Sequence, residues 1–279
     1  MRWIVGDVHG MLGPLRVMVD EVRKADKEAV FYFAGDYCDR GPDTKGVVDL
    51  LLEMTAAGEA FCVRGNHDDV FDLCLNGHTF ATGPDTGGSV DTPDVVEIVR
   101  LFWREGLLET MSSYGVDLSE ASEHSGGSTE KYYAWVLEQF QQVPKPHRDF
   151  FRNLPGVVEA DDFFVVHALW EPDEPDPAGK LAKRLEADDY LRYEAIWGRY
   201  DARKIRADKR WKRRCYVGHT PTDTYVGHDD LMSDWGQVIV ADQLTLVDTA
   251  CFSPSGRLSA ACHDDGRVVQ VHHTGEVLT

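Results

Sequence analysis

Three short motifs decide how this chain folds: GDVHG at residues 6–10, GDYCDRG at residues 35–41 and RGNHDD at residues 64–69. Each motif follows a short run of strand-forming residues, at 3–5, 30–34 and 60–63. The intervals between them carry apolar residues at helical spacing, over Leu12–Val22 and Val47–Met54. A strand, a helical crossover and a second strand form a βαβ unit, whose strands pair in parallel. We therefore predict an α/β fold built outward from these segments.

Three later strand-like runs also end in polar residues. Residues 163–166 precede His167, residues 216–217 lead into GHT at 218–220, and residues 244–247 precede Asp248. In open α/β sheets, ligands bind beyond the carboxyl ends of the strands. The sequence therefore predicts that six strand ends meet at one rim.

The remaining segments predict a helical cover and a hairpin. Residues 94–153 carry aromatic and aliphatic side chains at helical spacing. Turn-forming residues predict loops at 76–93, 115–129 and 171–179. Alternating runs around Asp264-Asp265-Gly266 predict a β-hairpin. We expect two packed mixed β-sheets flanked by helices, in a single domain over residues 1–279.

Composition limits the partners and the compartment. The chain carries 48 acidic and 29 basic residues, a net charge of −19, which disfavours nucleic acid and anionic membranes as partners. No apolar run is long enough to span a bilayer, and a strand beginning at Arg2 leaves no room for a signal peptide. We therefore expect a cytoplasmic protein. Its six scattered cysteines are expected to be reduced and buried.

The predicted rim collects carboxylate, amide and imidazole side chains: Asp7, His9, Asp36, Asn66, His167 and His219. This mixed donor set suits Mn, Fe or Zn better than Ca, which prefers oxygen ligands alone. Six ligands exceed one transition-metal site and match two sites that share a bridging carboxylate. Such a pair of metals clamps the attacking and leaving oxygens of a phosphoryl displacement. Any one of these residues alone is weak evidence; the inference rests on their joint occurrence at strand ends.

Taken in order, the three motifs, His167 and GHT resemble the phosphoprotein phosphatases of the calcineurin-like metallophosphoesterase superfamily. The resemblance extends from Gly6 to about Asp248. The compact length and the IWGR stretch at 196–199 resemble its bacterial and phage branch. This resemblance implies a four-layer αββα fold and two divalent metal ions. Manganese is the metal we expect, with iron or zinc as alternatives.

The resemblance also implies individual roles for the metal ligands. Asp7 and His9 would bind the first metal, and Asp36 would bridge both. The second metal would be completed by Asn66, His167 and His219.

It implies roles for the remaining motif residues as well. His67 would be the general acid, oriented by Asp39. Arg40 and Arg199 would hold the phosphoryl oxygens, with Arg64 nearby in a weaker, partly structural role.

These roles predict an enzyme that hydrolyses phosphoserine and phosphothreonine in proteins or peptides, with phosphotyrosine as a further substrate. A metal-bridging hydroxide would attack phosphorus in line. The alternative is a hydrolase of dinucleoside polyphosphates or another small phosphate ester. Bacterial dinucleoside tetraphosphatases are similar but tend to lack the second Asp of GDxxDRG, which is Asp39 here. An inactive scaffold that binds phosphoproteins is disfavoured, because a scaffold need not keep His67 and Asp39 beside six ligands.

Three departures from the family pattern leave loop geometry, and hence substrate fit, open. Ala168 stands where Gly is common, Asp68 where Glu is usual, and VDTA at 247–250 where VDTG is usual. The Lys- and Arg-rich segment 199–214 is either a solvated helix face or a docking site for an acidic phosphorylated partner.

Overall fold

The computed structural model describes residues 1–81, 92–172, 180–207, 211–227 and 235–278. Its first sheet has the strand order β11-β10-β9-β1-β2-β3. The strands are β1 (Arg2–Val5), β2 (Val30–Phe33), β3 (Ala60–Cys62), β9 (Arg257–Cys262), β10 (Val268–His272) and β11 (Val277–Leu278). Strands β1, β2 and β3 pair in parallel, whereas β9 runs antiparallel to β1. The three motif-bearing strands therefore end at the same edge.

The second sheet has the order β4-β5-β6-β8-β7. Its strands are β4 (Val157–Glu159), β5 (Phe163–Val166), β6 (Arg214–Val217), β7 (Ile239–Val240) and β8 (Leu244–Leu246). Here β5, β6 and β8 are parallel, while β4 and β7 run antiparallel at the two edges. Both sheets are mixed, as predicted.

Strand alternation sorts the core into layers. Ile4 of the first sheet packs with Phe163 and Val165 of the second in a cluster between the sheets. The alternate residues Trp3 and Val5 belong to the cluster that includes the buried face of α1 (Leu12–Ala25) and α2 (Thr44–Ala56).

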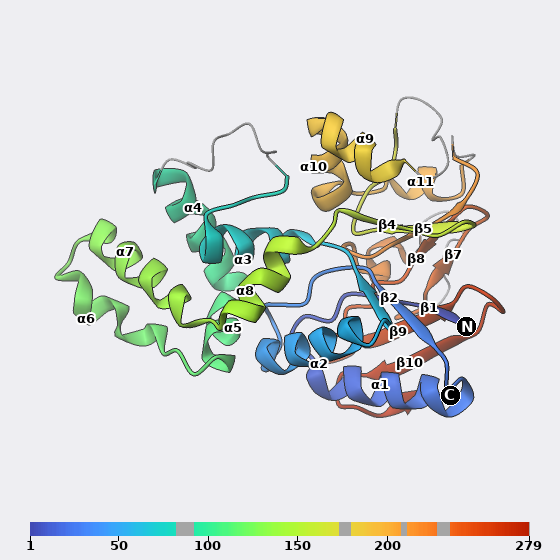
Figure 1. Cartoon of the computed structure of the whole chain (residues 1–279), viewed down its shortest axis with the longest axis horizontal. Coiled ribbons are helices and arrows are strands. Elements are labelled where there is room, and N and C mark those ends of the chain that lie inside the picture. The colour runs from blue at the N-terminus through green and yellow to red at the C-terminus, as the bar shows by residue number, and fades with distance from the viewer. Residues whose placement is uncertain (82–91, 173–179, 208–210, 228–234, 279) are drawn as a thin grey trace.

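The second sheet is covered on its outer face by three helices: α9 (Leu181–Ala187), α10 (Asp189–Trp197) and α11 (Ala202–Ile205). The result is the helix–sheet–sheet–helix arrangement expected for the calcineurin-like fold (Figure 1).

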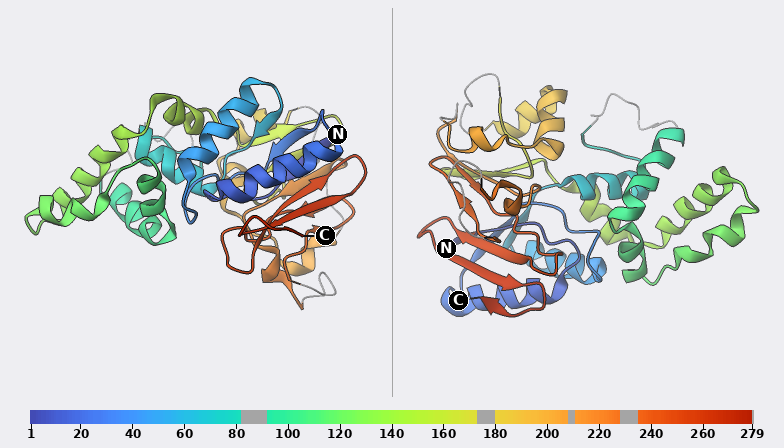
Figure 2. Two further views of the ribbon diagram at one scale, coloured as in Figure 1. Left: turned by 90° about the horizontal axis from the view of Figure 1, so that it is seen from below. Right: turned by 180° about the vertical axis from the view of Figure 1, so that it is seen from behind.

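The helical cover forms a lobe that projects to one side of the sheets in all three views (Figures 1 and 2). It comprises α4 (Thr92–Phe102), η2 (Trp103–Glu105), α5 (Leu107–Ser113), η3 (Leu118–Glu120), α6 (Ala121–Ser125), α7 (Thr129–Gln139), η4 (Phe140–Gln142) and α8 (Lys145–Asn153). The lobe packs against α3 (Asn66–Asn76), which carries the end of the third motif. A further short helix, η5 (Thr222–Tyr225), follows the GHT motif.

One loop prediction is wrong, because residues 115–129 contain η3 and α6. The Asp117 carboxylate accepts a hydrogen bond from the Ser119 N–H at 2.8 Å, and Leu118 and Ala121 are buried. Two buried apolar residues and a capped start outweigh the turn-forming composition. Most of the predicted loops 76–93 and 171–179 lies outside the described residues.

Several smaller predictions are confirmed. Strands β9 and β10 form the C-terminal hairpin, with Ala261 opposite Val268. All six cysteines are buried and form no disulfide bond. Within the described residues, no helix combines the length and the apolar character that crossing a membrane requires.

Candidate metal centre

The polar strand ends of both sheets meet in tight turns with unusual backbone geometry. Among the described residues, six non-glycine residues have positive φ, and five of them were predicted for the site from sequence: His9 (45°), Asp36 (53°), Asp39 (67°), Arg40 (67°) and His219 (65°). The sixth is Ala250 (57°). Non-glycine residues adopt this region at a cost, and such strain gathers at functional sites. The backbone is therefore held in place to aim these side chains.

Two groups of potential metal ligands share one carboxylate. His9, Asp36 and His67 form the first group, and Asp36, His167 and His219 form the second, with all the donor atoms of each group within 4.8 Å of one another. The same oxygen, Asp36 Oδ2, lies 3.6 Å from His9 Nε2 and 3.5 Å from His167 Nε2. A carboxylate in this position is suited to bridge two ions.

Asn66 and Asp7 join these groups from neighbouring strand ends. The Asn66 Oδ1 atom lies 3.1 Å from His167 Nε2 and 2.9 Å from His219 Nδ1. The Asp7 carboxylate accepts the backbone N–H of His219, at 3.0 and 3.2 Å. The structure therefore brings all six sequence-predicted ligands together.

Backbone carbonyls orient two of the imidazoles. His9 Nδ1–H donates to the Cys38 carbonyl at 2.9 Å, and His167 Nδ1–H donates to the Ala34 carbonyl at 2.7 Å. These bonds place the proton of each ring on Nδ1 and leave the Nε2 lone pair on the side of Asp36, where it could bind a metal. Burial lowers the pKa of His9, His167 and His219, so the neutral imidazole that binds metals is the favoured form.

The buried carboxylates show that the centre suits a cation. Burial, together with the charges of Asp248 and Asp36, raises the pKa of Asp7 well above its usual value. Burial also raises the pKa of Asp248 to about 6. Asp248 Oδ2 and His219 Nε2 are both buried without a hydrogen-bond partner. Divalent cations would relieve this repulsion and satisfy the unpartnered atoms, so the residues fit a metal centre.

Asp248 was not among the ligands selected from the sequence. Its position directly after a strand-forming run, like that of His167, was the available signal. We add it to the site as a buried carboxylate beside Asp7.

Two glycines make room for the ligands. A Cβ on Gly65 would lie 2.1 Å from Asp36 Oδ1, and a Cβ on Gly218 would lie 2.0 Å from Asp7 Oδ1. Side chains at these positions would displace the carboxylates.

Asp68 ties the second motif to the third. Its Oδ2 accepts the N–H groups of Asp36 and Gly65, at 2.9 and 2.8 Å, and its Oδ1 accepts the Tyr37 N–H at 2.9 Å. Asp68, which stands where the family usually has the longer Glu, thus fixes the turn that carries Asp36.

His67 and Asp39 form a buried pair. His67 Nδ1–H donates to Asp39 Oδ2 at 2.7 Å, which leaves Nε2 facing the Arg40 guanidinium at 3.1 Å. Burial lowers the pKa of His67, but the Asp36 charge and the Asp39 hydrogen bond outweigh it and hold the pKa above its ordinary value. A protonated imidazole in this position is suited to donate a proton.

Thr110 supports this pair from the helical lobe and was missed in the sequence. Its buried hydroxyl donates to Asp39 Oδ1 at 2.8 Å and accepts the Asp39 N–H at 2.8 Å. Nothing in the sequence linked a threonine in a helical segment to an aspartate 71 positions away.

The three predicted phosphate-binding arginines lie in different surroundings. Arg40 reaches the first ligand group, with Nη1 donating to His9 Nε2 at 3.0 Å. Arg199 is exposed and donates to Thr220 Oγ1 at 2.9 Å, and its charge contributes to the lowered pKa of His219. The two guanidinium groups therefore flank the two ligand groups.

Arg64 is not brought to this cluster. Its side chain is 1% exposed, and its N–H groups donate to Asp69, to Asp72 and to the carbonyls of Phe151, Arg152 and Leu154. These five hydrogen bonds use the full donor capacity of a guanidinium. They support the structural part of its expected role and offer no N–H to a phosphoryl group.

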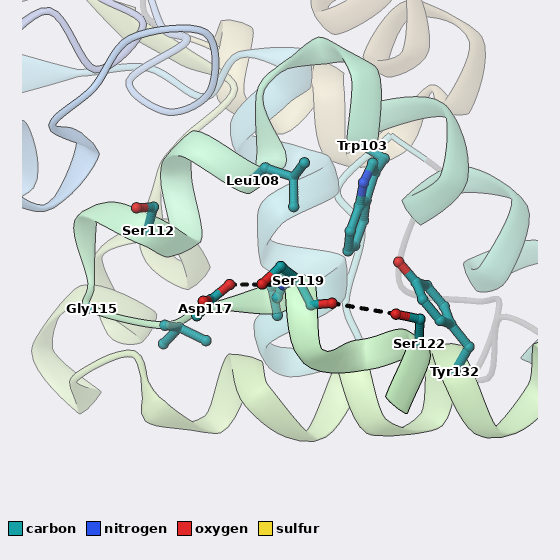
Figure 3. A pocket seen from close by; sticks show the side chains of 10 residues that line it. Trp103, Leu108, Ser112, Gly115, Asp117, Ser119, Ser122 and Tyr132 are labelled. Atoms are coloured by element: carbon teal, nitrogen blue, oxygen red, sulfur yellow. Dashed lines mark hydrogen bonds between the residues drawn. The ribbon is translucent and has the colours of Figure 1, made fainter. Parts of the chain in front are cut away.

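A separate pocket of about 650 Å³ lies within the helical lobe. Figure 3 shows Trp103 and Tyr132 on one side of it and Asp117, Ser119 and Ser122 along its floor. None of the metal-centre residues lines it. This pocket is therefore distinct from the metal centre.

Comparisons with known proteins agree with this geometry. The family model described as calcineurin-like phosphoesterase matches residues 2–228. A "Serine/threonine-protein phosphatase 1" from Salmonella typhimurium is 40% identical over 70 residues, which cover 24% of this chain and 30% of that protein. A "Bis(5'-nucleosyl)-tetraphosphatase, symmetrical" from Nitrosospira multiformis is 30% identical over 113 residues, 40% of each protein. The chain thus matches less than half the length of either relative.

A solved structure described as a "putative diadenosine tetraphosphatase" shares the fold. It superposes with a TM-score of 0.53 over 97% of this chain and 92% of that one, at 18% identity.

Proposed function

We propose that this chain, which belongs to the calcineurin-like phosphoesterase family, cleaves dinucleoside polyphosphates. At the level of the family, it is a metal-dependent phosphoester hydrolase. One observation supports a mechanism with two metal ions: the same oxygen, Asp36 Oδ2, lies 3.6 Å from His9 Nε2 and 3.5 Å from His167 Nε2.

The choice of substrate rests on the comparisons. The likeness to the Nitrosospira tetraphosphatase extends over 113 residues, against 70 for the Salmonella protein phosphatase. We therefore place a dinucleoside polyphosphate ahead of the phosphoprotein that the motifs alone favoured. Water would attack an internal phosphorus and break one P–O–P bridge, releasing two nucleotides.

When bound, two divalent ions would polarise the phosphoryl oxygens and activate the attacking water. Asp36, His9, Asp7, Asn66, His167 and His219 would hold them, with Asp248 adding negative charge. Carboxylate, amide and imidazole donors together suit manganese, with iron or zinc as the alternatives. The planar guanidinium groups of Arg40 and Arg199 would donate hydrogen bonds to the phosphoryl oxygens.

A phosphoprotein phosphatase is the second candidate, favoured by the His67–Asp39 pair. Serine and threonine alkoxides are poor leaving groups and need a proton in the transition state, whereas a nucleotide leaves as a stable anion. A buried, oriented imidazole is therefore of most use with a phosphoserine or phosphothreonine substrate. The 40% identity to the Salmonella protein phosphatase also favours this candidate.

Side-by-side turnover would decide between the two. We would compare kcat/KM for diadenosine tetraphosphate, a phosphoserine peptide and an aryl phosphate, with Mn²⁺, Fe²⁺ and Zn²⁺ each supplied to metal-free protein. The proposal expects diadenosine tetraphosphate to be the best substrate by at least tenfold. A phosphoserine peptide that is turned over faster than the tetraphosphate would replace it with the second candidate.

A further inference from the structure

Helix α10 carries aromatic side chains on its solvent side. Its buried face is formed by Leu191, Ala195 and Ile196. Tyr193 and Trp197, four residues apart on one face of the helix, have ring centroids 6.4 Å apart and planes only 16° from parallel. Tyr193 is 49% exposed. Tyr193 thus presents ring area to the solvent beside the half-buried Trp197, and exposed apolar area of this kind is typical of a binding surface.

This aromatic pair is linked to the candidate metal centre through one intervening ring, Phe102. The Trp197 ring meets the Phe102 ring at 6.1 Å and 90°, and Phe102 packs on the His67 imidazole at 5.0 Å and 71°. Two positions after Trp197, the Arg199 guanidinium bonds Thr220, the residue that follows His219. The aromatic surface therefore lies beside the groups that would hold a phosphoryl group.

We propose that Tyr193 and Trp197 form a platform on which the base of a nucleoside phosphate stacks while its phosphate lies at the metal centre. This inference rests on the proposed function and names the part of the substrate that the metal ions do not contact. Every nucleobase has a flat π-face, and aromatic side chains bind it largely without regard to sequence. The adjacent Arg199 would bind the phosphate, so base and phosphate are recognised by consecutive parts of one segment.

The opposite sign of charge near the platform supports a nucleotide over an uncharged aromatic ligand. The chain as a whole carries a net charge of −19, which repels anions. Arg40 and Arg199 bring positive charge to the two ligand groups. A ligand that is both aromatic and anionic matches the surface formed by Tyr193, Trp197 and Arg199.

The test compares two inhibitors that differ only by the base. AMP and ribose 5-phosphate are used as competitive inhibitors of p-nitrophenyl phosphate hydrolysis by the metal-loaded protein. Inhibition constants are compared because they do not depend on the KM of the reporter substrate. Tyr193→Ala removes the exposed ring. Tyr193→Phe keeps the ring, and Tyr190→Ala removes another exposed tyrosine of α10, 73% exposed, as a matched control.

We expect Tyr193→Ala to raise the AMP inhibition constant roughly 5- to 150-fold, which corresponds to the about 1–3 kcal/mol contributed by one base–aromatic stack. Ribose 5-phosphate should inhibit all variants equally, and Tyr193→Phe and Tyr190→Ala should bind AMP like the parent protein. Equal AMP constants in Tyr193→Ala and the parent would overturn the platform. A shift for ribose 5-phosphate as large as that for AMP would also overturn it, since the effect would then lie on the phosphate.

The same variants separate this inference from the proposed function. Failure of the parent protein to hydrolyse diadenosine tetraphosphate, with AMP binding still dependent on Tyr193, would reject the proposed function and leave the platform standing. If Tyr193→Ala hydrolysed diadenosine tetraphosphate with the same kcat/KM as the parent protein, the platform would be rejected and the proposed function would stand. If the substitution weakened only a phosphopeptide with an aromatic neighbour, the platform would belong to a protein substrate and the nucleobase assignment would fall.

Discussion

Replacing Thr110 with valine should impair hydrolysis in proportion to how poor the leaving group is. The substitution keeps the shape of the side chain and removes one hydroxyl. That hydroxyl makes two 2.8 Å hydrogen bonds to Asp39, one to its carboxylate and one from its backbone N–H. Asp39, in turn, accepts the Nδ1–H of His67 at 2.7 Å. Thr110→Val should therefore weaken the positioning of His67, the proposed acid, without changing His67 itself.

The size of the effect follows from these bonds. A hydrogen bond to a charged group contributes about 1.5–3 kcal/mol, which corresponds to roughly 10- to 150-fold in rate if all of it acts in the transition state. General acid catalysis as a whole is worth roughly 10²–10⁴-fold, which sets the ceiling for His67→Asn. We expect Thr110→Val to lower kcat for a phosphoserine peptide by roughly tenfold, Asp39→Asn by more, and His67→Asn by most.

Initial rates on three substrates, with elemental analysis of each variant, provide the test. p-Nitrophenyl phosphate and diadenosine tetraphosphate release stable anions, so their rates should change by less than about threefold in all three variants. Thr110→Ser restores the hydroxyl and should recover the peptide rate. A merely structural Thr110 would instead lower the melting temperature and slow every substrate equally. Loss of metal from His67→Asn, with all rates falling together, would make His67 a ligand of the first group, as its proximity to His9 and Asp36 also permits.

Four further substitutions test the centre and its arginines. Asp36→Asn should lose metal from both positions and His9→Ala chiefly from one; two equivalents of metal retained by a fully active Asp36→Asn would refute the shared carboxylate. Arg199→Ala should lower kcat/KM by roughly 10- to 100-fold and weaken inhibition by inorganic phosphate, and an unchanged phosphate inhibition constant would remove Arg199 from the site. Arg64→Met should leave that constant unchanged and lower the free energy of unfolding by about 3–5 kcal/mol, because Asp69 and Asp72 lose a buried partner. Denaturant unfolding measures this loss, and a weaker phosphate inhibition at unchanged stability would place Arg64 at the phosphate instead.

The sequence was sufficient to predict which side chains gather at the candidate metal centre, because each of them lies within a few residues of a strand end. Parallel strands carry such positions to one edge, so Asp7, Asp36 and Asn66 had to approach one another once β1, β2 and β3 were recognised. Asp248 obeys the same rule and could have been added on that ground.

Other residues depend on packing that no local pattern specifies. Arg64 is adjacent to the ligand motif, yet its side chain runs to α8 and to the acidic residues of α3 instead of the metal centre. Thr110 and Phe102 contact the His67–Asp39 pair only because the lobe docks there. Helical spacing predicted that Phe102 would pack within the cover but not which groups it would meet, and nothing in the sequence singled out Thr110.

The lobe contacts the residues proposed for catalysis and is therefore more than a cover. Gly106 approaches the second motif so closely that a Cβ there would lie 1.8 Å from the Arg40 backbone nitrogen. Next to it, Glu105 pairs with the Arg40 guanidinium at 3.3 Å, and Thr110 holds Asp39. The turn that carries Arg40 and Asp39, the proposed phosphate-binding arginine and the proposed partner of the acid, is thus positioned from outside its own sheet. We therefore expect substitutions in the short segment from Phe102 to Thr110 to change how firmly His67 is held, and with it the rate of reactions that need a proton donor.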